Sequence, residues 1–142
     1  MNYNLERFIK AQEKDYNKAL SEIKQGKKQS HWIWYIFPQL KELGHSSTAQ
    51  YYGIKDEEEA RQYFQNTLLK DHLIEITKEL YKQNNNIKKI LGYPDYLKVK
   101  SCMTLFSYID PTIDIFQKVI DKFYHGNKDE ITINLLKKKQ IN

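Results

Sequence analysis

Cysteine, glycine, proline and arginine are all scarce in this sequence of 142 residues. Cys102 is the only cysteine, which excludes an intramolecular disulfide and a zinc site built on cysteine pairs. The five glycines are scattered, so no glycine-rich phosphate loop is present. No apolar run approaches the roughly 20 residues that a membrane helix needs. No apolar run preceded by lysines begins the chain, so we expect no signal peptide and a cytoplasmic location.

The sequence signatures of the common hydrolases and nucleoside triphosphatases are missing as well. Neither H-E-x-x-H nor G-x-S-x-G occurs, and no two of the four histidines lie within a helical turn or two of each other. We therefore expect no bound metal and no cofactor.

The charge balance is positive, with a formal net charge of +5. Only Arg7 and Arg61 are arginines, and the lysines form no basic stripe on any one helix. A small anionic ligand suits this balance, whereas a nucleic-acid partner is disfavoured. The alternative is that the lysines simply form solvated helix faces.

Apolar residues recur at helical spacing along most of the chain, between signals that start and stop helices. The first helix is expected to begin at an Asn4 cap and to stop at Gly26. Later N-cap candidates are Ser46 or Ser47, Asp56 and Asp129. No segment alternates as a strand would, and the length is that of one domain. We predict an all-α fold: a compact single-domain bundle of about six to eight helices over residues 1–142.

An aromatic run, S-H-W-I-W-Y-I-F-P-Q-L, occupies residues 30–40. It is apolar on every side and therefore buried, and we favour a helix because no other segment offers a strand partner. Either Trp32 or Trp34 could stack on a planar ligand, although both could equally pack in the core. Gln39 must find hydrogen-bond partners, in a ligand or in the backbone of the following loop.

The start of this run suggests an anion site. Ser30 is expected to cap a helix, with Lys27 and Lys28 just before it. Free backbone N–H groups, a hydroxyl and lysines at a helix N-terminus attract phosphate or carboxylate. The alternative is a capped helix with two surface lysines. His31 has three interpretations: a core histidine, a ligand-binding donor, or a general acid or base.

A second block, G-Y-P-D-Y-L-K-V-K-S-C-M-T-L-F-S-Y, spans residues 92–108. On a helix, Lys98, Ser101 and Thr104 would form a polar strip suited to an anionic, hydroxyl-rich ligand. The alternative is that the hydroxyls bond back to the preceding turn. Cys102 has no activating partner in the sequence, so it is not expected to act as a nucleophile.

These two blocks, together with N-L-E-R-F-I-K-A-Q near the start and F-Y-H-G-N-K-D-E-I-T-I-N-L-L near the end, resemble one family. It is the bacterial domain-of-unknown-function family 1810, sometimes labelled calpastatin, and the resemblance covers nearly the whole chain. The matching positions are Ser30, His31, Trp32, Trp34, Phe37, Pro38, Gln39, Lys98, Ser101, Met103, Thr104, Leu105 and Phe106. Where the family often has two serines, this chain has Ser101 followed by Cys102. The resemblance implies a compact helical domain and no established chemistry.

The two polar blocks predict binding, with hydrolysis left open, of a phosphorylated, ring-bearing small molecule such as a nucleotide or an ADP-ribose/NAD-type metabolite. Lys28, Ser30 and Lys98 would bind anionic oxygens, and Trp32 or Trp34 would stack on the ring. His31, Gln39, Ser101 and Thr104 would bind hydroxyls or ring edges, and His31 is the candidate for proton transfer. Two alternatives are non-catalytic sequestration of a nucleotide signal by a defence or anti-defence protein, and a basic-surface module for protein or nucleic-acid interaction.

Overall fold

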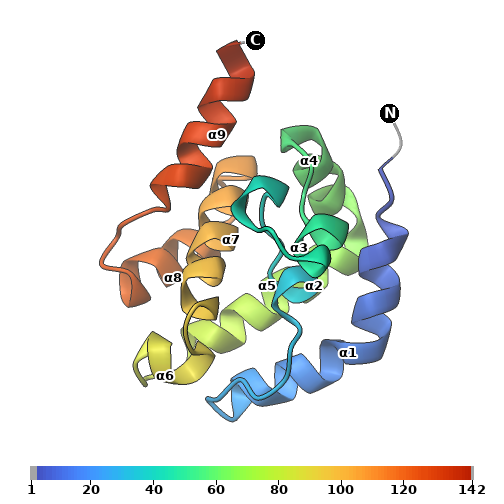
Figure 1. The fold of residues 1–142 in the computed structure, drawn as a ribbon. Helices are drawn as coiled ribbons and strands as arrows, with labels where there is room; N and C mark the ends of the chain where they lie inside the picture. Colours follow the sequence, from blue (N-terminus) through green and yellow to red (C-terminus); the bar gives the residue numbers. More distant parts are fainter. Residues whose placement is uncertain (1–2, 142) are drawn as a thin grey trace.

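Helices build the entire fold (Figure 1). The computed structural model describes residues 3–141, with side chains up to residue 138. This part of the chain contains nine α-helices, one short 3-10 helix (η1) and no strand beyond an isolated bridge between Leu40 and Ile54. In order they are α1 (Glu6–Lys24), α2 (Ile33–Ile36), η1 (Lys41–Leu43), α3 (Ser47–Tyr52), α4 (Glu57–Gln65), α5 (Thr67–Tyr81), α6 (Ile87–Leu91), α7 (Asp95–Ile109), α8 (Ile115–Phe123) and α9 (Glu130–Ile141). The all-α prediction is confirmed, with a helix count slightly above the predicted range.

Side-chain caps start five of these helices. Each of these side chains accepts a backbone N–H of its helix: Ser46 for α3, Asp56 for α4, Asn66 for α5, Asn86 for α6 and Asp129 for α9. The predicted cap at Asn4 is wrong, because α1 begins at Glu6 after Leu5 and has no side-chain cap. The backbone carbonyl of Asn4 instead accepts a hydrogen bond from Arg7.

The helix start expected at Ser30 is also wrong. The helix α2 begins three residues later, at Ile33, and is only four residues long. The hydroxyl of Ser30 donates to Glu22 at 2.6 Å and caps nothing. The aromatic run does form a helix, as predicted, and its side chains Ile33, Trp34 and Ile36 are buried.

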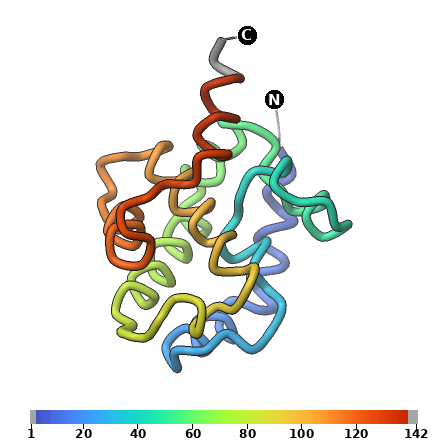
Figure 2. The backbone as a smooth tube through the Cα atoms, turned by 60° about the vertical axis from the view of Figure 1, so that its left-hand side comes forward, coloured from blue at the N-terminus to red at the C-terminus, as the bar shows by residue number. Residues whose placement is uncertain are grey.

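The helix α7 runs through the middle of the molecule and packs against α2, α4, α6, α8 and α9 (Figure 1). Phe106 on α7 contacts Tyr63 and Phe64 of α4 and Phe116 of α8, with ring centroids 5.5, 5.7 and 6.1 Å apart. These rings tie three helices into one core. The helix α1 packs on α5, which in turn packs on α8. Only α9 extends beyond the rest of the fold, in both views (Figures 1 and 2).

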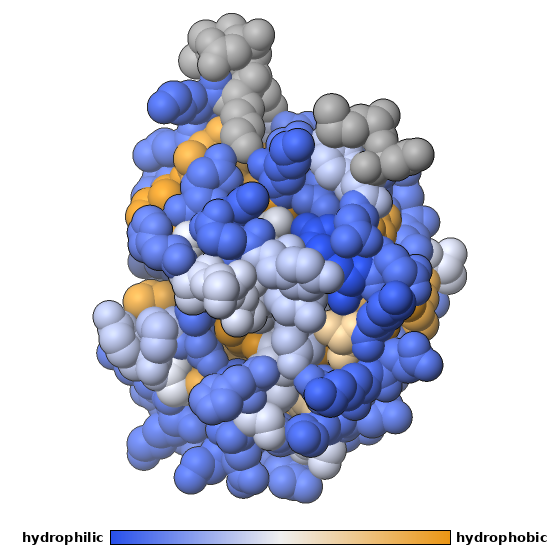
Figure 3. Space-filling view, turned by 45° about the vertical axis from the view of Figure 1, so that its right-hand side comes forward, coloured by the Kyte–Doolittle hydropathy of each residue, from blue (hydrophilic) through white to orange (hydrophobic). Residues whose placement is uncertain are grey.

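The face of the molecule drawn in Figure 3 is mostly hydrophilic. On the face drawn in Figure 3, small hydrophobic patches lie between hydrophilic side chains. Within residues 3–141, no helix combines the length and the apolar character needed to cross a membrane.

Candidate functional site

One carboxylate fixes the loop of residues 25–32. Glu22, near the end of α1, accepts hydrogen bonds from the backbone N–H groups of Gln29 and Ser30, at 2.7 and 2.9 Å. It also accepts from the Ser30 hydroxyl at 2.6 Å and from indole Nε1 of Trp32 at 2.9 Å. Burial by itself raises the pKa of Glu22, but these hydrogen bonds outweigh burial and lower the pKa to about 2. Glu22 is therefore ionised at neutral pH and anchors the loop.

A pocket of about 210 Å³ opens beside this loop. Its walls come from the loop, from α2, from the start of α3 and from the first turn of α7. The lining residues are Lys28, His31, Ile33, Trp34, Tyr35, Ser46, Thr48, Asp95 and Lys98. The two blocks singled out in the sequence therefore meet here.

Two lysines share one carboxylate in this pocket. Asp95 pairs with Lys28 at 2.8 Å and with Lys98 at 3.3 Å. The Lys28 side chain is only 7% exposed, and its ammonium also donates to the backbone carbonyl of Ser30. Two positive charges against one negative charge leave the pocket with an excess of one positive charge. Because Lys28 is nearly enclosed, that charge is less screened than on an open surface.

Hydrogen-bonding groups form the exposed rim. The side chains of His31, Ser46 and Thr48 are exposed and line the pocket. Tyr35 donates its hydroxyl to the backbone carbonyl of His31 at 3.2 Å and to Asp15. This places the Tyr35 ring beside the pocket. An anion in the pocket would therefore meet two ammonium groups, two hydroxyls and one imidazole.

The two tryptophans have different surroundings. Trp32 is 1% exposed, donates to Glu22 and lies outside the pocket. Trp34 lines the pocket but is only 6% exposed, and the ammonium of Lys98 lies 5.7 Å from the centre of its ring. Both tryptophans thus belong mainly to the core.

Four of the predicted site residues, Lys28, His31, Trp34 and Lys98, come together in the pocket. The other five predicted residues lie outside it: Ser30, Trp32, Gln39, Ser101 and Thr104. Ser101 donates to the carbonyl of Leu97 at 3.2 Å, so its hydroxyl bonds back to the preceding turn. Thr104 does the same to Lys100 at 2.8 Å and also accepts the backbone N–H of Asp129 at 2.9 Å.

Gln39 also lies outside the pocket. It is 2% exposed, and its amide nitrogen has no hydrogen-bond partner among the described residues. Its backbone carbonyl accepts from the N–H of Ile54 at 2.8 Å.

The comparisons with known proteins agree with the sequence resemblance. The family described as "Protein of unknown function (DUF1810)" matches residues 2–136. The chain belongs to this family. A solved structure, that of the conserved hypothetical protein Rv1873 from Mycobacterium tuberculosis, is similar to this DUF1810 protein, with a TM-score of 0.93 and 40% sequence identity. The match covers 95% of this chain and 97% of the mycobacterial one. No protein with a curated description matches.

Sequence reasoning about this DUF1810 protein missed Asp95 and Glu22. Asp95 stands three residues before Lys98 at the start of a predicted helix, a spacing that favours an ion pair on one helix face. The ion pair between Asp95 and Lys98 could therefore have been predicted from the sequence. Glu22 reaches its partners across a loop, 7 to 10 residues along the chain, and no periodicity reports such a contact.

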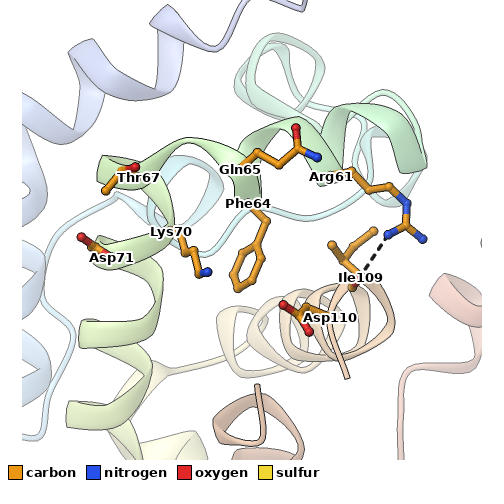
Figure 4. Close-up of a pocket in the computed structure, with 8 residues that line it drawn as sticks. All are labelled: Arg61, Phe64, Gln65, Thr67, Lys70, Asp71, Ile109 and Asp110. Carbon is orange, nitrogen blue, oxygen red and sulfur yellow. Dashed lines mark hydrogen bonds between the residues drawn. The ribbon is translucent and has the colours of Figure 1, made fainter. Parts of the chain in front are cut away.

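A larger cavity, of about 430 Å³, lies elsewhere on the DUF1810 fold (Figure 4). Arg61 of α4 borders it and donates to the carbonyl of Ile109 at 3.3 Å, and Lys70 of α5 lies on another wall. Asp71 and Asp110 balance these two positive charges. None of the residues predicted for the site lines this cavity. The smaller pocket, with its positive excess, is therefore the candidate functional site.

The described side chains offer no metal centre. In residues 3–138, no three histidine, cysteine, aspartate or glutamate side chains are grouped so that they could hold a metal ion.

Proposed function

We propose that this protein binds a phosphorylated small molecule and that the phosphate enters the pocket between Lys28, His31 and Lys98. One observation carries the proposal. Residues from two distant blocks of the sequence meet in one pocket, where two lysines share a single carboxylate.

The charge arrangement favours a phosphate over a neutral ligand. Asp95 accepts from both lysines and leaves one positive charge uncompensated. Hydrogen bonds between ionised partners are the strong ones, and lysine binds phosphate as a point charge. The hydroxyls of Ser46 and Thr48 on the rim add donors that need no charge.

The pocket volume limits which part of the ligand is enclosed. Pockets that enclose a whole drug-sized ligand measure roughly 300–1,000 Å³. This pocket, at about 210 Å³, is smaller and suits a phosphate with the atoms next to it. The remainder of a nucleotide or an ADP-ribose/NAD-type metabolite would lie on the adjoining surface. Such metabolites occur in the cytoplasm, which is the location we propose.

The test is a binding measurement by calorimetry and thermal shift. The probes are inorganic phosphate, ribose 5-phosphate, AMP, ADP-ribose and NAD. A ligand at 100 times its dissociation constant should stabilise the fold by about 2.7 kcal/mol. Lys98→Ala and His31→Ala should each weaken binding. Lys118→Ala is the matched control, because Lys118 also pairs with an aspartate of its own chain, Asp114 at 3.4 Å, but lies outside the pocket.

Failure of every phosphorylated probe to stabilise the wild-type protein would contradict the proposal. So would a loss of affinity in Lys118→Ala equal to that in Lys98→Ala. For any ligand that binds, analysis of products after incubation separates the two remaining roles. Multiple turnovers that stop in His31→Ala assign hydrolysis, and unchanged ligand at stoichiometric protein assigns sequestration.

A further inference from the structure

Three tyrosine rings touch one another next to the pocket. Tyr35 of α2 lies 4.9 Å from Tyr52, and Tyr52 lies 4.8 Å from Tyr51, both on α3 (centroid distances). The planes of Tyr51 and Tyr52 meet at 83°. Tyr51, Tyr52 and Tyr35, called here the tyrosine cluster, therefore form an angled surface rather than a flat stack.

The cluster is continuous with the pocket. Tyr35 lines the pocket itself, and so does Thr48. Tyr51 and Tyr52 follow Thr48 by three and four residues in α3, so all three side chains project from one face of this helix. One helical turn rises about 5.4 Å, so the backbones of Tyr51 and Tyr52 lie about one turn along α3 from Thr48. Tyr51 itself lines a separate pocket, together with Arg7 and Gln50. The rings of Tyr35 and Tyr52 therefore connect the pocket to the exposed ring of Tyr51.

Contacts with Phe8 and Arg7 fix the tyrosine cluster, while the ring of Tyr51 is exposed to solvent. The ring of Phe8, which is fully buried, lies 6.1 Å from Tyr52. Arg7 donates to the backbone carbonyls of Tyr51 at 2.8 Å and Gly53 at 3.2 Å, which fixes the end of α3. Tyr51 nevertheless remains 57% exposed. An exposed ring on a fixed backbone is available for stacking with little loss of conformational entropy.

The tryptophans offer no such surface. Trp32 is buried outside the pocket, and Trp34 is buried with the Lys98 ammonium over its ring. The exposed aromatic surface beside the phosphate pocket is therefore made of tyrosine.

We propose that the tyrosine cluster binds the planar ring of the ligand whose phosphate occupies the pocket, which makes the ligand a nucleotide or another ring-bearing phosphate ester. This inference rests on the proposed function, since it requires a phosphate in the pocket. It assigns ring recognition to Tyr51 and Tyr52, with Tyr35 between them and the pocket. The sequence had directed attention to Trp32 and Trp34 for this role.

The experiment compares AMP with ribose 5-phosphate, which carries the same sugar phosphate without a base. Stacking of one base on an aromatic side chain typically changes affinity by about tenfold or more. We expect AMP to bind wild-type protein about tenfold more tightly than ribose 5-phosphate. Tyr51→Ala should remove that difference by weakening AMP alone, and Tyr51→Phe should keep it. Ile131→Ala is the control, since Ile131 is 60% exposed on α9, away from the pocket walls.

The outcomes separate the two proposals. Equal affinities of AMP and ribose 5-phosphate for the wild-type protein would overturn ring recognition while leaving the phosphate site intact. An equal loss for both ligands in Tyr51→Ala would also overturn it, because the ring would then act on the fold or on the phosphate. If neither ligand binds, the proposed function fails and this inference fails with it.

Discussion

At the scale of single residues, Glu22 is the side chain on which the loop of residues 25–32 depends most. Its two oxygens accept four hydrogen bonds from the loop, two of them from backbone N–H groups. A carboxylate can accept at all of these positions, whereas an amide presents two N–H donors in place of one oxygen. The loop also carries Lys28 and His31, so the shape of the pocket depends on Glu22.

Glu22→Gln should therefore lower the free energy of unfolding by about 2 kcal/mol, because buried donors lose their acceptor. The measurement is urea unfolding at neutral pH. Glu13→Gln is the matched control, since Glu13 is exposed on the same helix and the charge change is identical. A loss no larger than that of the control would show that the loop does not depend on the carboxylate.

The stability difference between wild type and Glu22→Gln should also depend on pH. The folded-state pKa of about 2 lies below the ordinary value of 4.5. Ionised Glu22 therefore stabilises the fold fully above pH 4.5, and its contribution falls as the pH drops from 4.5 toward 2. Urea unfolding at pH 7 and pH 3 measures the change. A difference that is the same at both pH values would contradict the assigned pKa.

Asp95 forms ion pairs with both lysines of the pocket, so under the proposed function its charge opposes the binding of an anion there. Removing a unit charge about 5 Å from an anion is worth about 3 kcal/mol at an effective dielectric constant of 20, before the lysines rearrange. With about half of this energy offset by rearrangement of the lysines, Asp95→Asn should tighten binding of inorganic phosphate by roughly tenfold, which corresponds to about 1.4 kcal/mol. Calorimetry measures the change in phosphate affinity. Asp114→Asn is the control, because it removes the carboxylate that pairs with Lys118 outside the pocket. Unchanged or weaker binding in Asp95→Asn would mean that the phosphate does not meet these lysines.

At the scale of elements, one hydroxyl joins α9 to α7. Thr104 in α7 accepts the backbone N–H of Asp129, the residue that caps α9, while donating to its own helix. Thr104→Val keeps the side-chain shape and removes both bonds. Amide hydrogen exchange in α9 should then speed up about five- to thirtyfold, with little change in α1 and α5.

Thr77→Val is the matched control for that substitution. Thr77 is fully buried in α5, and its hydroxyl has no hydrogen-bond partner among the described residues. Losing this hydroxyl should leave stability unchanged or raise it slightly, because no bond is lost and a buried polar group is removed. Equal effects of the two substitutions would contradict the role of Thr104 in holding α9. If Thr104→Val changed the phosphate affinity but not the hydrogen exchange of α9, Thr104 would belong to the binding site after all.

Local signals in the sequence predicted which segments are helical better than they predicted the residue at which each helix begins. The caps at Ser46, Asp56 and Asp129 depend on contacts within three residues, which the sequence displays directly. The cap expected at Ser30 failed because its hydroxyl donates to Glu22, eight residues earlier in the chain. The cap expected at Asn4 failed because α1 begins one residue later than expected, with Leu5 in the cap position.

In the candidate site, too, the contacts within one helix could be predicted from the sequence and the contacts between helices could not. Asp95 and Lys98 are neighbours on one helix, so their pairing was within reach of spacing arguments. The approach of His31 to Lys98 depends on how α2 packs on α7, a tertiary contact that no local pattern contains. For Ser101 and Thr104 the simpler local alternative, a bond back to the preceding turn, is what the structure shows.

At the scale of the whole molecule, the rate at which the single cysteine reacts with a thiol reagent measures how often the fold unfolds. Cys102 has no exposed surface and lies in the middle of α7, which packs against five other helices. Burial also raises the pKa of its thiol, so little reactive thiolate forms in the folded state. Exposing this sulfur requires the surrounding helices to separate.

Labelling of Cys102 by a thiol reagent should therefore proceed only through unfolding. The opening free energy from labelling rates should match the free energy of unfolding from urea titration. A ligand that binds only the folded state lowers the open population by a factor of 1 + [L]/Kd, so at 100 times its dissociation constant it should slow labelling about a hundredfold. In Lys98→Ala the same concentration should slow labelling much less, because the pocket has lost one of its two cations. Rapid labelling of the native protein would show that α7 opens locally. A ligand that raises the thermal transition without slowing the label would likewise show that Cys102 reacts through a local opening that leaves the ligand bound.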